Sequence, residues 1–174
     1  MTEDLSEAIS GLAQAMRIEQ DGMRFYRQAK DSVSDERGKK MYASLLRDEE
    51  VHLRILQTEH DRLSKTGNWV SLDEAKQGGR TLTLFPDEVS GAIIFAPGMS
   101  DLDALKLAMD FEDKGYRLYD EAAKKATSLA AQGVYRFLAQ QESQHFAVLQ
   151  RSHSYLANDG VWFFDDMQSP QLDG

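Results

Sequence analysis

Apolar side chains recur along this chain of 174 residues with the period of an α-helix. In the first stretch they fall three, four and seven residues apart and form one stripe, made of Leu5, Ile9, Leu12, Met16 and Met23. A similar stripe follows in Met41, Leu45, Leu53 and Leu56. The whole pattern predicts four long helices, at about 3–31, 35–65, 100–126 and 128–157.

Capping and turn residues mark where these helices begin and where the chain changes direction. Ser34 and Ser100 are the expected N-caps of the second and third helices, because acidic residues follow each of them within the first turn. The segment 69–99 contains glycine and proline pairs, so no long helix is expected to cross it. Its apolar run at 92–96 predicts that this connection packs on the helices. We expect one bundle domain over 1–164 and a flexible tail over 165–174, which is polar and contains a proline.

The two halves of the chain repeat one pattern at an offset of 93 residues. Between Leu12 and Trp69, 18 of 58 positions are identical to those 93 residues later, with no gap. All four histidines and both tryptophans fall into register. The repeat predicts a bundle built from two helix pairs related by an internal two-fold axis.

The overall charge and the absence of cysteine restrict the classes of function. The formal net charge is −9, and an acidic surface is repelled by nucleic acid and by anionic membranes, so neither is an expected partner. Without cysteine, the chain offers no disulfide, zinc finger or cysteine-ligated iron–sulfur centre. Any metal would have to be held by His, Asp and Glu.

The chain shows no sign of export or of membrane insertion. Residues 1–10 lack the basic region and apolar run of a signal peptide. No apolar stretch approaches the roughly 20 residues that span a bilayer. We therefore expect a cytoplasmic protein.

One set of carboxylates and imidazoles has the spacing of metal ligands. Glu49 and His52 lie three residues apart, so on a helix both side chains can face one centre, and Glu142 and His145 repeat this pair. A lone glutamate precedes each pair by 30 residues, Glu19 in the first half and Glu112 in the second. A single Glu-x-x-His pair is often only helix surface, but here two occur in register, and each has an upstream partner at the same spacing.

The six residues together suit two divalent metal ions. Four carboxylates provide oxygen ligands and four negative charges, and each half adds one imidazole. Iron and manganese both accept such a ligand set, so the sequence leaves two iron ions, two manganese ions or a mixed pair open. A Glu from each of two helices and Glu-x-x-His from the other two is the known arrangement of dimetal carboxylate bundles.

Two tyrosines and two further histidines lie on the same helix faces as the predicted ligands. Tyr26 and Tyr119 follow Glu19 and Glu112 by seven residues, so each phenol could hydrogen-bond a ligand carboxylate across the bundle. The alternative is that both are ordinary core aromatics. His60 and His153 lie roughly 16 Å along the helix from Glu49 and Glu142, too far to share a metal with them. Hydrogen-bonded histidines in the core or at the end of the bundle are the expected interpretation.

These motifs resemble those of the rubrerythrin-like branch of the ferritin-like superfamily. The matching residues span about 5–157 and are Glu19-x6-Tyr26, Glu49-x-x-His52, Glu112-x6-Tyr119 and Glu142-x-x-His145. The resemblance implies an all-α, ferritin-like four-helix bundle with a long left-handed crossover between its second and third helices. It also implies a non-haem di-iron centre that reacts with hydrogen peroxide or dioxygen, commonly in a homodimer. By position, Glu49 and Glu142 resemble the bridging carboxylates of that centre, and Glu19 and Glu112 the terminal ones.

Two departures from the family pattern bear on function. Full-length rubrerythrins carry a cysteine-ligated rubredoxin domain that passes electrons to the di-iron site, so a chain without cysteine implies an external electron-donor protein. Rubrerythrins also carry an extra glutamate three residues after the third-helix ligand, where this chain has Gly115. That glutamate is tied to a redox-linked change of iron ligation in the family.

Three functions remain open at this point. The first is an oxidoreductase that oxidises Fe(II) with peroxide or dioxygen and is then reduced again. The second is an iron-binding or iron-delivery protein in which no substrate turns over. The third is a scaffold that has kept only the fold, and the presence of all six ligands argues against it.

Overall fold

Four long helices and one short helix form the part of the chain that the computed structural model describes, which is residues 5–79, 81–82, 84 and 91–164. The helices are α1 (Leu5–Ser32), α2 (Glu36–Thr66), α3 (Leu72–Lys76), α4 (Asp101–Lys125) and α5 (Leu129–Asp159). No β-strand occurs in these residues. The four predicted helices are confirmed to within two residues at each end, and the predicted tail lies outside the described residues. The short helix α3 is an element that the sequence pattern did not indicate.

Side chains cap the helices close to where the sequence predicted. Ser100 caps α4 as expected, because its hydroxyl accepts a hydrogen bond from the Asp103 N–H. The prediction that Ser34 caps α2 is wrong. Asp35 takes that position, and its carboxylate accepts from the Arg37 N–H at 2.8 Å. A carboxylate beside the positive end of the helix adds a charge interaction that a serine hydroxyl lacks.

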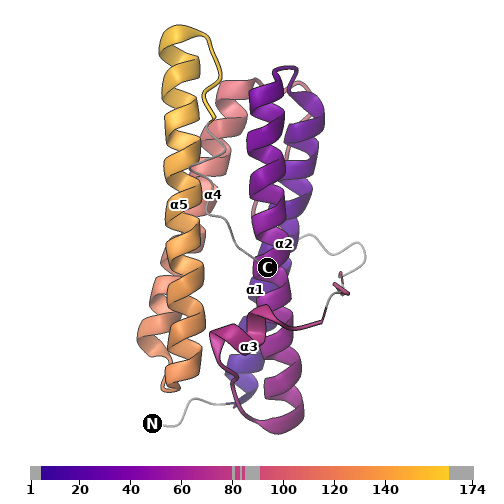
Figure 1. Cartoon of the computed structure of the whole chain (residues 1–174), viewed down its shortest axis with the longest axis vertical. Coiled ribbons are helices and arrows are strands. Elements are labelled where there is room, and N and C mark those ends of the chain that lie inside the picture. The colour runs from indigo at the N-terminus through magenta and orange to yellow at the C-terminus, as the bar shows by residue number, and fades with distance from the viewer. Residues whose placement is uncertain (1–4, 80, 83, 85–90, 165–174) are drawn as a thin grey trace.

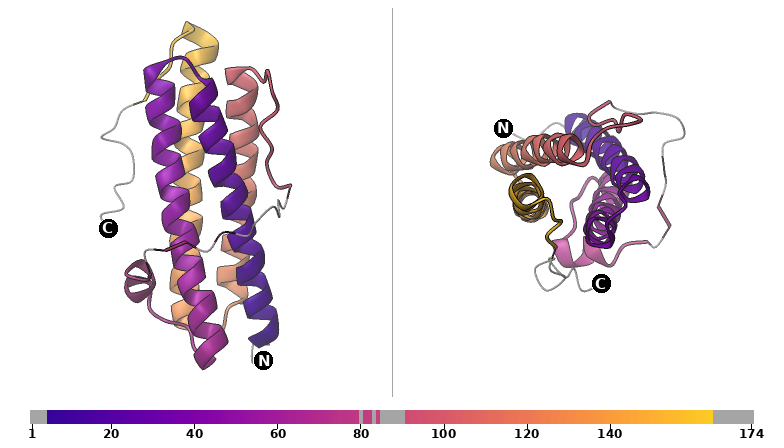
Figure 2. Two further views of the ribbon diagram at one scale, coloured as in Figure 1. Left: turned by 90° about the vertical axis from the view of Figure 1, so that its right-hand side faces the viewer. Right: turned by 90° about the horizontal axis from the view of Figure 1, so that it is seen from above.

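The four long helices surround a common apolar core, as the view along the bundle axis shows (Figure 2). α1 packs along α2, and α4 packs along α5. α1 and α5 run in one direction, while α2 and α4 run in the other (Figure 2). α2 therefore ends, and α4 begins, at opposite ends of the bundle. The left-handed crossover and the two-fold relation between the halves stay predictions.

Part of the connection between α2 and α4 packs on the bundle. Ile93 is buried in the core, and the Phe95 ring lies 5.7 Å from that of Phe25 on α1. The buried Asp21 carboxylate accepts a hydrogen bond from the Ala92 N–H at 3.2 Å. The apolar run at 92–96 thus contacts the helices through alternate residues, while Ile94 between them is exposed.

The segments that follow α2 and α5 are fastened to the bundle at corresponding positions. Both helices end at a glycine with positive φ, Gly67 at 68° and Gly160 at 66°. After α2, the buried Glu59 carboxylate accepts from the Val70 N–H at 3.1 Å. After α5, the buried Ser152 hydroxyl donates to the Phe163 carbonyl at 2.7 Å.

Glu59 makes stability depend on pH. Burial raises the pKa of Glu59 to about 7, although the Val70 hydrogen bond lowers it in part. In the unfolded chain the group has its ordinary pKa of 4.5. Between these two values the folded protein holds a proton that the unfolded chain has lost, so the free energy of unfolding falls as the pH rises from 4.5 to about 7.

We expect Glu59→Gln to remove this contribution while keeping an acceptor for Val70. Relative to the natural protein, the variant should gain stability as the pH rises from 4.5 to about 7, with no further change above that. Urea denaturation at several pH values measures the free energy of unfolding of both proteins. Glu7→Gln, at an exposed carboxylate of α1, is the control. A difference between Glu59→Gln and the natural protein that stays constant with pH would contradict the assignment.

Candidate metal centre

The middle of the bundle contains a cluster of carboxylates and imidazoles that could hold metal ions. No other such cluster occurs among the described residues. The members of this cluster come from all four long helices: Glu19 from α1, Glu49 and His52 from α2, Glu112 from α4, and Glu142 and His145 from α5. Each of the six residues is at most 2% exposed. The helical spacing that suggested these residues does bring them together.

Two histidines face the carboxylates with the same ring nitrogen. His52 Nδ1 lies 3.1 Å from Glu142 Oε1 and 3.5 Å from Glu19 Oε2. His145 Nδ1 lies 3.4 Å from oxygens of Glu49 and of Glu112. Each imidazole thus contacts the Glu-x-x-His glutamate of the other half, and the two rings stack with their centroids 5.4 Å apart.

The cluster divides into two groups, each of which could hold a metal ion. One donor atom from each of Glu19, Glu49, His52 and Glu142 lies within 4.8 Å of the others. The same limit holds for the second group, which consists of Glu49, Glu112, Glu142 and His145. Glu49 and Glu142 belong to both groups. Each of them can therefore offer one carboxylate oxygen to the first group and its other oxygen to the second.

Unpartnered atoms show that a metal fits here. Several buried polar atoms of the cluster have no hydrogen-bond partner within the described part of the chain, namely both oxygens of Glu49, both ring nitrogens of His52, Glu112 Oε2, Glu142 Oε1 and His145 Nδ1. Burying such groups without partners is costly. Hard divalent cations such as iron or manganese would satisfy carboxylate oxygens and imidazole nitrogens together.

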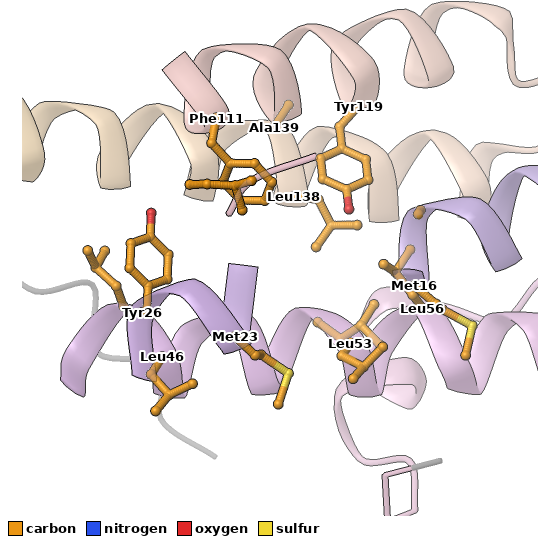
Figure 3. Close-up of a cluster of buried hydrophobic side chains, with 14 of the residues drawn as sticks. Met16, Met23, Tyr26, Leu46, Leu53, Leu56, Phe111, Tyr119, Leu138 and Ala139 are labelled. Carbon is orange, nitrogen blue, oxygen red and sulfur yellow. The ribbon is translucent and has the colours of Figure 1, made fainter. Parts of the chain in front are cut away.

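Two tyrosines bind the cluster from opposite sides. Figure 3 shows the hydroxyl groups of Tyr26 and Tyr119 pointing into the space between the two helix pairs. Tyr26 on α1 donates a short hydrogen bond to Glu112 on α4, and Tyr119 on α4 donates one to Glu19 on α1. The hydrogen bonds expected across the bundle are therefore present, and they fix the orientation of both lone glutamates.

Two glycines allow the helices to approach the glutamates closely. A Cβ atom on Gly115 would lie 3.3 Å from Cγ and from Oε2 of Glu142. A Cβ atom on Gly22 would lie 3.0 Å from the Phe111 ring and 3.5 Å from Glu49 Oε2. Glu142 itself thus occupies the space beside Gly115, where the family's extra glutamate would begin.

The four carboxyl groups differ in pKa. Burial raises the pKa of Glu49 and of Glu142 well above the ordinary value, and the charges of the neighbouring glutamates add to this effect. Burial acts on Glu19 in the same direction, but its interactions with Glu49 and His52 and the hydrogen bond from Tyr119 outweigh burial and lower its pKa to about 2. The pKa of Glu112 is lowered likewise, against burial, by His145 and Glu142. Without metal, the shared glutamates therefore hold their protons to a higher pH than the lone ones do.

Asp48 contacts the cluster although the sequence did not single it out. Its Oδ2 lies 3.2 Å from His145 Nε2, on the far side of the ring from the glutamates. Burial alone would lower the pKa of His145, but Glu112 and Asp48 raise it well above the ordinary value. The residue 93 positions later is Gln141, so the second half has no matching carboxylate. The sequence feature that could have indicated Asp48 is its position directly before Glu49.

His60 and His153 lie outside both groups, in agreement with the distance argument. His60 Nδ1 is 3.6 Å from Asp61, and its side chain is 30% exposed. His153 Nε2 is buried and has no hydrogen-bond partner among the described residues. Neither histidine contributes to the cluster.

Comparison with known protein families agrees with this site. The family model for rubrerythrin matches residues 10–153, which include all six clustered residues and both tyrosines. The chain therefore belongs to the rubrerythrin family, within the ferritin-like superfamily. No curated protein and no solved structure gave a significant match. None of the described helices is both long and apolar enough to cross a membrane.

Metal binding should release protons. The raised pKa values of Glu49 and Glu142 favour the protonated forms of these groups in the metal-free protein, so we expect bound cations to displace protons from them. Anaerobic titration calorimetry with Fe(II), in two buffers of different ionisation enthalpy at neutral pH, measures the number released. Binding enthalpies that do not depend on the buffer would contradict the pKa assignment.

We expect Asp48→Asn to weaken one metal position more than the other. The substitution keeps the size of the side chain but removes the charge beside His145, and such partners of ligand histidines contribute about 10–100-fold to metal affinity. Competition with a chelator measures the two affinities. Gln141→Asn, at the corresponding position of the second half, is the control. An equal loss at both positions would show that Asp48 acts through the fold.

Proposed function

We propose that this protein is a non-haem di-iron carboxylate oxidoreductase that reacts Fe(II) with hydrogen peroxide or dioxygen. The observation that carries the proposal is the buried cluster of four glutamates and two histidines with unpartnered donor atoms. Membership of the rubrerythrin family supports it. Two manganese ions or a mixed pair would suit the same ligands.

The proposed ligand assignment follows the sharing of residues between the two groups. Glu49 and Glu142 belong to both groups and are proposed as bridging ligands. Glu19 and Glu112 each belong to one group, and each is held by a tyrosine from the opposite helix pair. His52 and His145 complete one position each. This assignment gives the halves the two-fold relation that the sequence repeat predicts.

The surrounding residues would control the reaction through orientation and burial. Bound iron would supply the electrons that reduce the oxidant. Tyr26 and Tyr119 hold the lone glutamates in one orientation, and the Asp48 carboxylate orients the His145 ring. The low exposure of all six residues keeps bulk water from the cluster. Because the chain has no cysteine, an external electron-donor protein is part of the proposal.

The second candidate function is iron binding or delivery without catalytic turnover. The space beside Gly115 favours it, because Glu142 occupies the position from which the family's extra glutamate would extend. A site without that glutamate has one carboxylate fewer to stabilise the oxidised metal pair. The homodimer and the cytoplasmic location stay predictions under either function.

Iron loading and turnover distinguish the two functions. Anaerobic loading should give about two Fe(II) per chain. The loaded protein is then mixed with hydrogen peroxide, with and without a chemical reductant such as ascorbate. Repeated peroxide consumption with reductant supports the oxidoreductase, and a single stoichiometric oxidation supports iron handling. Trace iron binding would contradict both functions.

Variants test the ligand assignment in the same assay. Glu49→Ala should lower the occupancy of both metal positions, and Glu19→Ala chiefly that of one. Glu121→Ala removes an exposed carboxylate of α4 and is the control. Equal losses in Glu49→Ala and Glu19→Ala would reject the distinction between bridging and terminal ligands.

A further inference from the structure

Two files of aromatic rings lead away from the carboxylate cluster. The first consists of Tyr26, Tyr42 and Trp162, and the second of Tyr119, Tyr135 and Trp69. Their members correspond to one another at the 93-residue offset. Each file begins with the phenol that donates to a lone glutamate, and Figure 3 shows both of these phenols directed inward.

Successive rings in each file are in contact. The centroids of Tyr26 and Tyr42 lie 6.1 Å apart, and those of Tyr42 and Trp162 lie 5.9 Å apart. In the second file the separations are 6.3 Å between Tyr119 and Tyr135, and 5.6 Å between Tyr135 and Trp69. These separations are those of ordinary aromatic pairs. Each file therefore joins the cluster to a tryptophan in the segment after a long helix.

The outer end of one file is open to small molecules. Trp69 is partly buried and lines a surface pocket of about 240 Å³, together with Leu5, Leu63, Gly67 and Ser128. Trp162 is less accessible, at 4% exposure, but its neighbour Val161 is 43% exposed. The hydrogen bonds of Glu59 to Val70 and of Ser152 to Phe163 fasten the residue next to each tryptophan.

Packing alone does not account for the tyrosine in the middle of the first file. Tyr42 is 1% exposed, and its hydroxyl has no hydrogen-bond partner among the described residues. Leaving a buried hydroxyl unpaired is unfavourable, so phenylalanine would fill the same space at lower free energy. A phenol at this position supplies what phenylalanine lacks, which is a ring that can be oxidised and reduced reversibly.

We propose that these two files, here called the aromatic relays, carry single electrons from the protein surface to the carboxylate cluster. The relays rest on the function proposed above, in which Fe(II) meets peroxide. Hydrogen peroxide needs two electrons, and a single Fe(II) supplies only one of them. The relays then supply the second electron.

The balance of this step involves one phenol. Hydrogen peroxide, one Fe(II) and the Tyr26 or Tyr119 phenol give Fe(III), hydroxide, water and a tyrosyl radical. The phenol supplies one electron and one proton, and its hydroxyl already points at a carboxylate. Each later transfer moves one electron and one proton. The second tyrosine reduces the first, the tryptophan indole N–H reduces the second tyrosine, and a neutral tryptophan radical remains. A one-electron reductant of the ascorbate class, together with a proton from water, restores the tryptophan.

The first test uses iron and peroxide. Protein loaded with substoichiometric Fe(II) is mixed anaerobically with hydrogen peroxide, frozen at successive times and examined by electron paramagnetic resonance, with ring-deuterated tyrosine to identify the radical. Tyr42→Phe combined with Tyr135→Phe keeps both rings and removes both hydroxyls. Tyr116→Phe, at a 40% exposed tyrosine outside the relays, is the control. Iron content is measured in every sample.

The double variant should lose the fast phase in which ascorbate removes the tyrosyl radical, and it should accumulate oxidised residues near the cluster, detected by mass spectrometry. The control should behave as the natural protein does. Iron-loaded protein that forms no aromatic radical, or radicals that decay alike in all three proteins, would overturn the relays and leave the proposed function standing.

A second test needs no metal and remains valid if iron does not bind. In metal-free protein, a photogenerated ruthenium(III) oxidant removes an electron from Trp69 at its pocket, and transient absorption follows the tryptophan radical. The oxidised Trp69 then takes an electron from Tyr135, which is the same exchange driven in the opposite direction. We expect the tryptophan signal to be replaced by a tyrosyl signal in the natural protein and in Tyr116→Phe, but more slowly or not at all in Tyr135→Phe. Identical decays in the three proteins would overturn the relay from Trp69.

Discussion

Burial of four carboxyl groups at one point in an apolar bundle is the constraint on which the rest of the structure depends. Four charges so close together repel one another, and water is not present to screen them. In the metal-free protein, burial and the neighbouring charges raise the pKa of Glu49 and of Glu142, which favours their protonated forms. Two divalent cations would meet it by replacing those protons with positive charge. The cluster would therefore release protons as it takes up metal ions.

The cluster also joins the two helix pairs at the centre of their common core. α1 packs chiefly on α2, and α4 packs chiefly on α5. Each of the two ligand groups takes residues from both helix pairs, and the hydrogen bonds of Tyr26 and Tyr119 cross between the pairs in opposite directions. Any movement of one pair relative to the other would disturb both groups together. The geometry of the cluster thus depends directly on the relative position of the two helix pairs.

The sequence predicted the long helices and the six clustered residues because both follow from helical periodicity within one segment. The sequence was less informative for residues whose most important contact is with a residue far away along the chain. Asp48 looks like any other acidic residue on a helix, and its contact with His145 spans 97 positions. Glu59 accepts a hydrogen bond from Val70, in a segment beyond the end of its own helix, and helical periodicity does not indicate that contact. The N-cap of α2 was misplaced by one residue because Ser34 and Asp35 are both good caps, and only the path of the backbone selects between them.

The hydrogen bonds that hold the segments after α2 and α5 respond differently to pH. They hold corresponding residues, but Glu59 accepts its hydrogen bond through a group that titrates near neutrality, whereas Ser152 donates through a hydroxyl that does not. The two fastenings lie at opposite ends of the bundle (Figure 2). A change in pH therefore acts on one of these hydrogen bonds and leaves the other unchanged, which makes the two ends of the bundle chemically different.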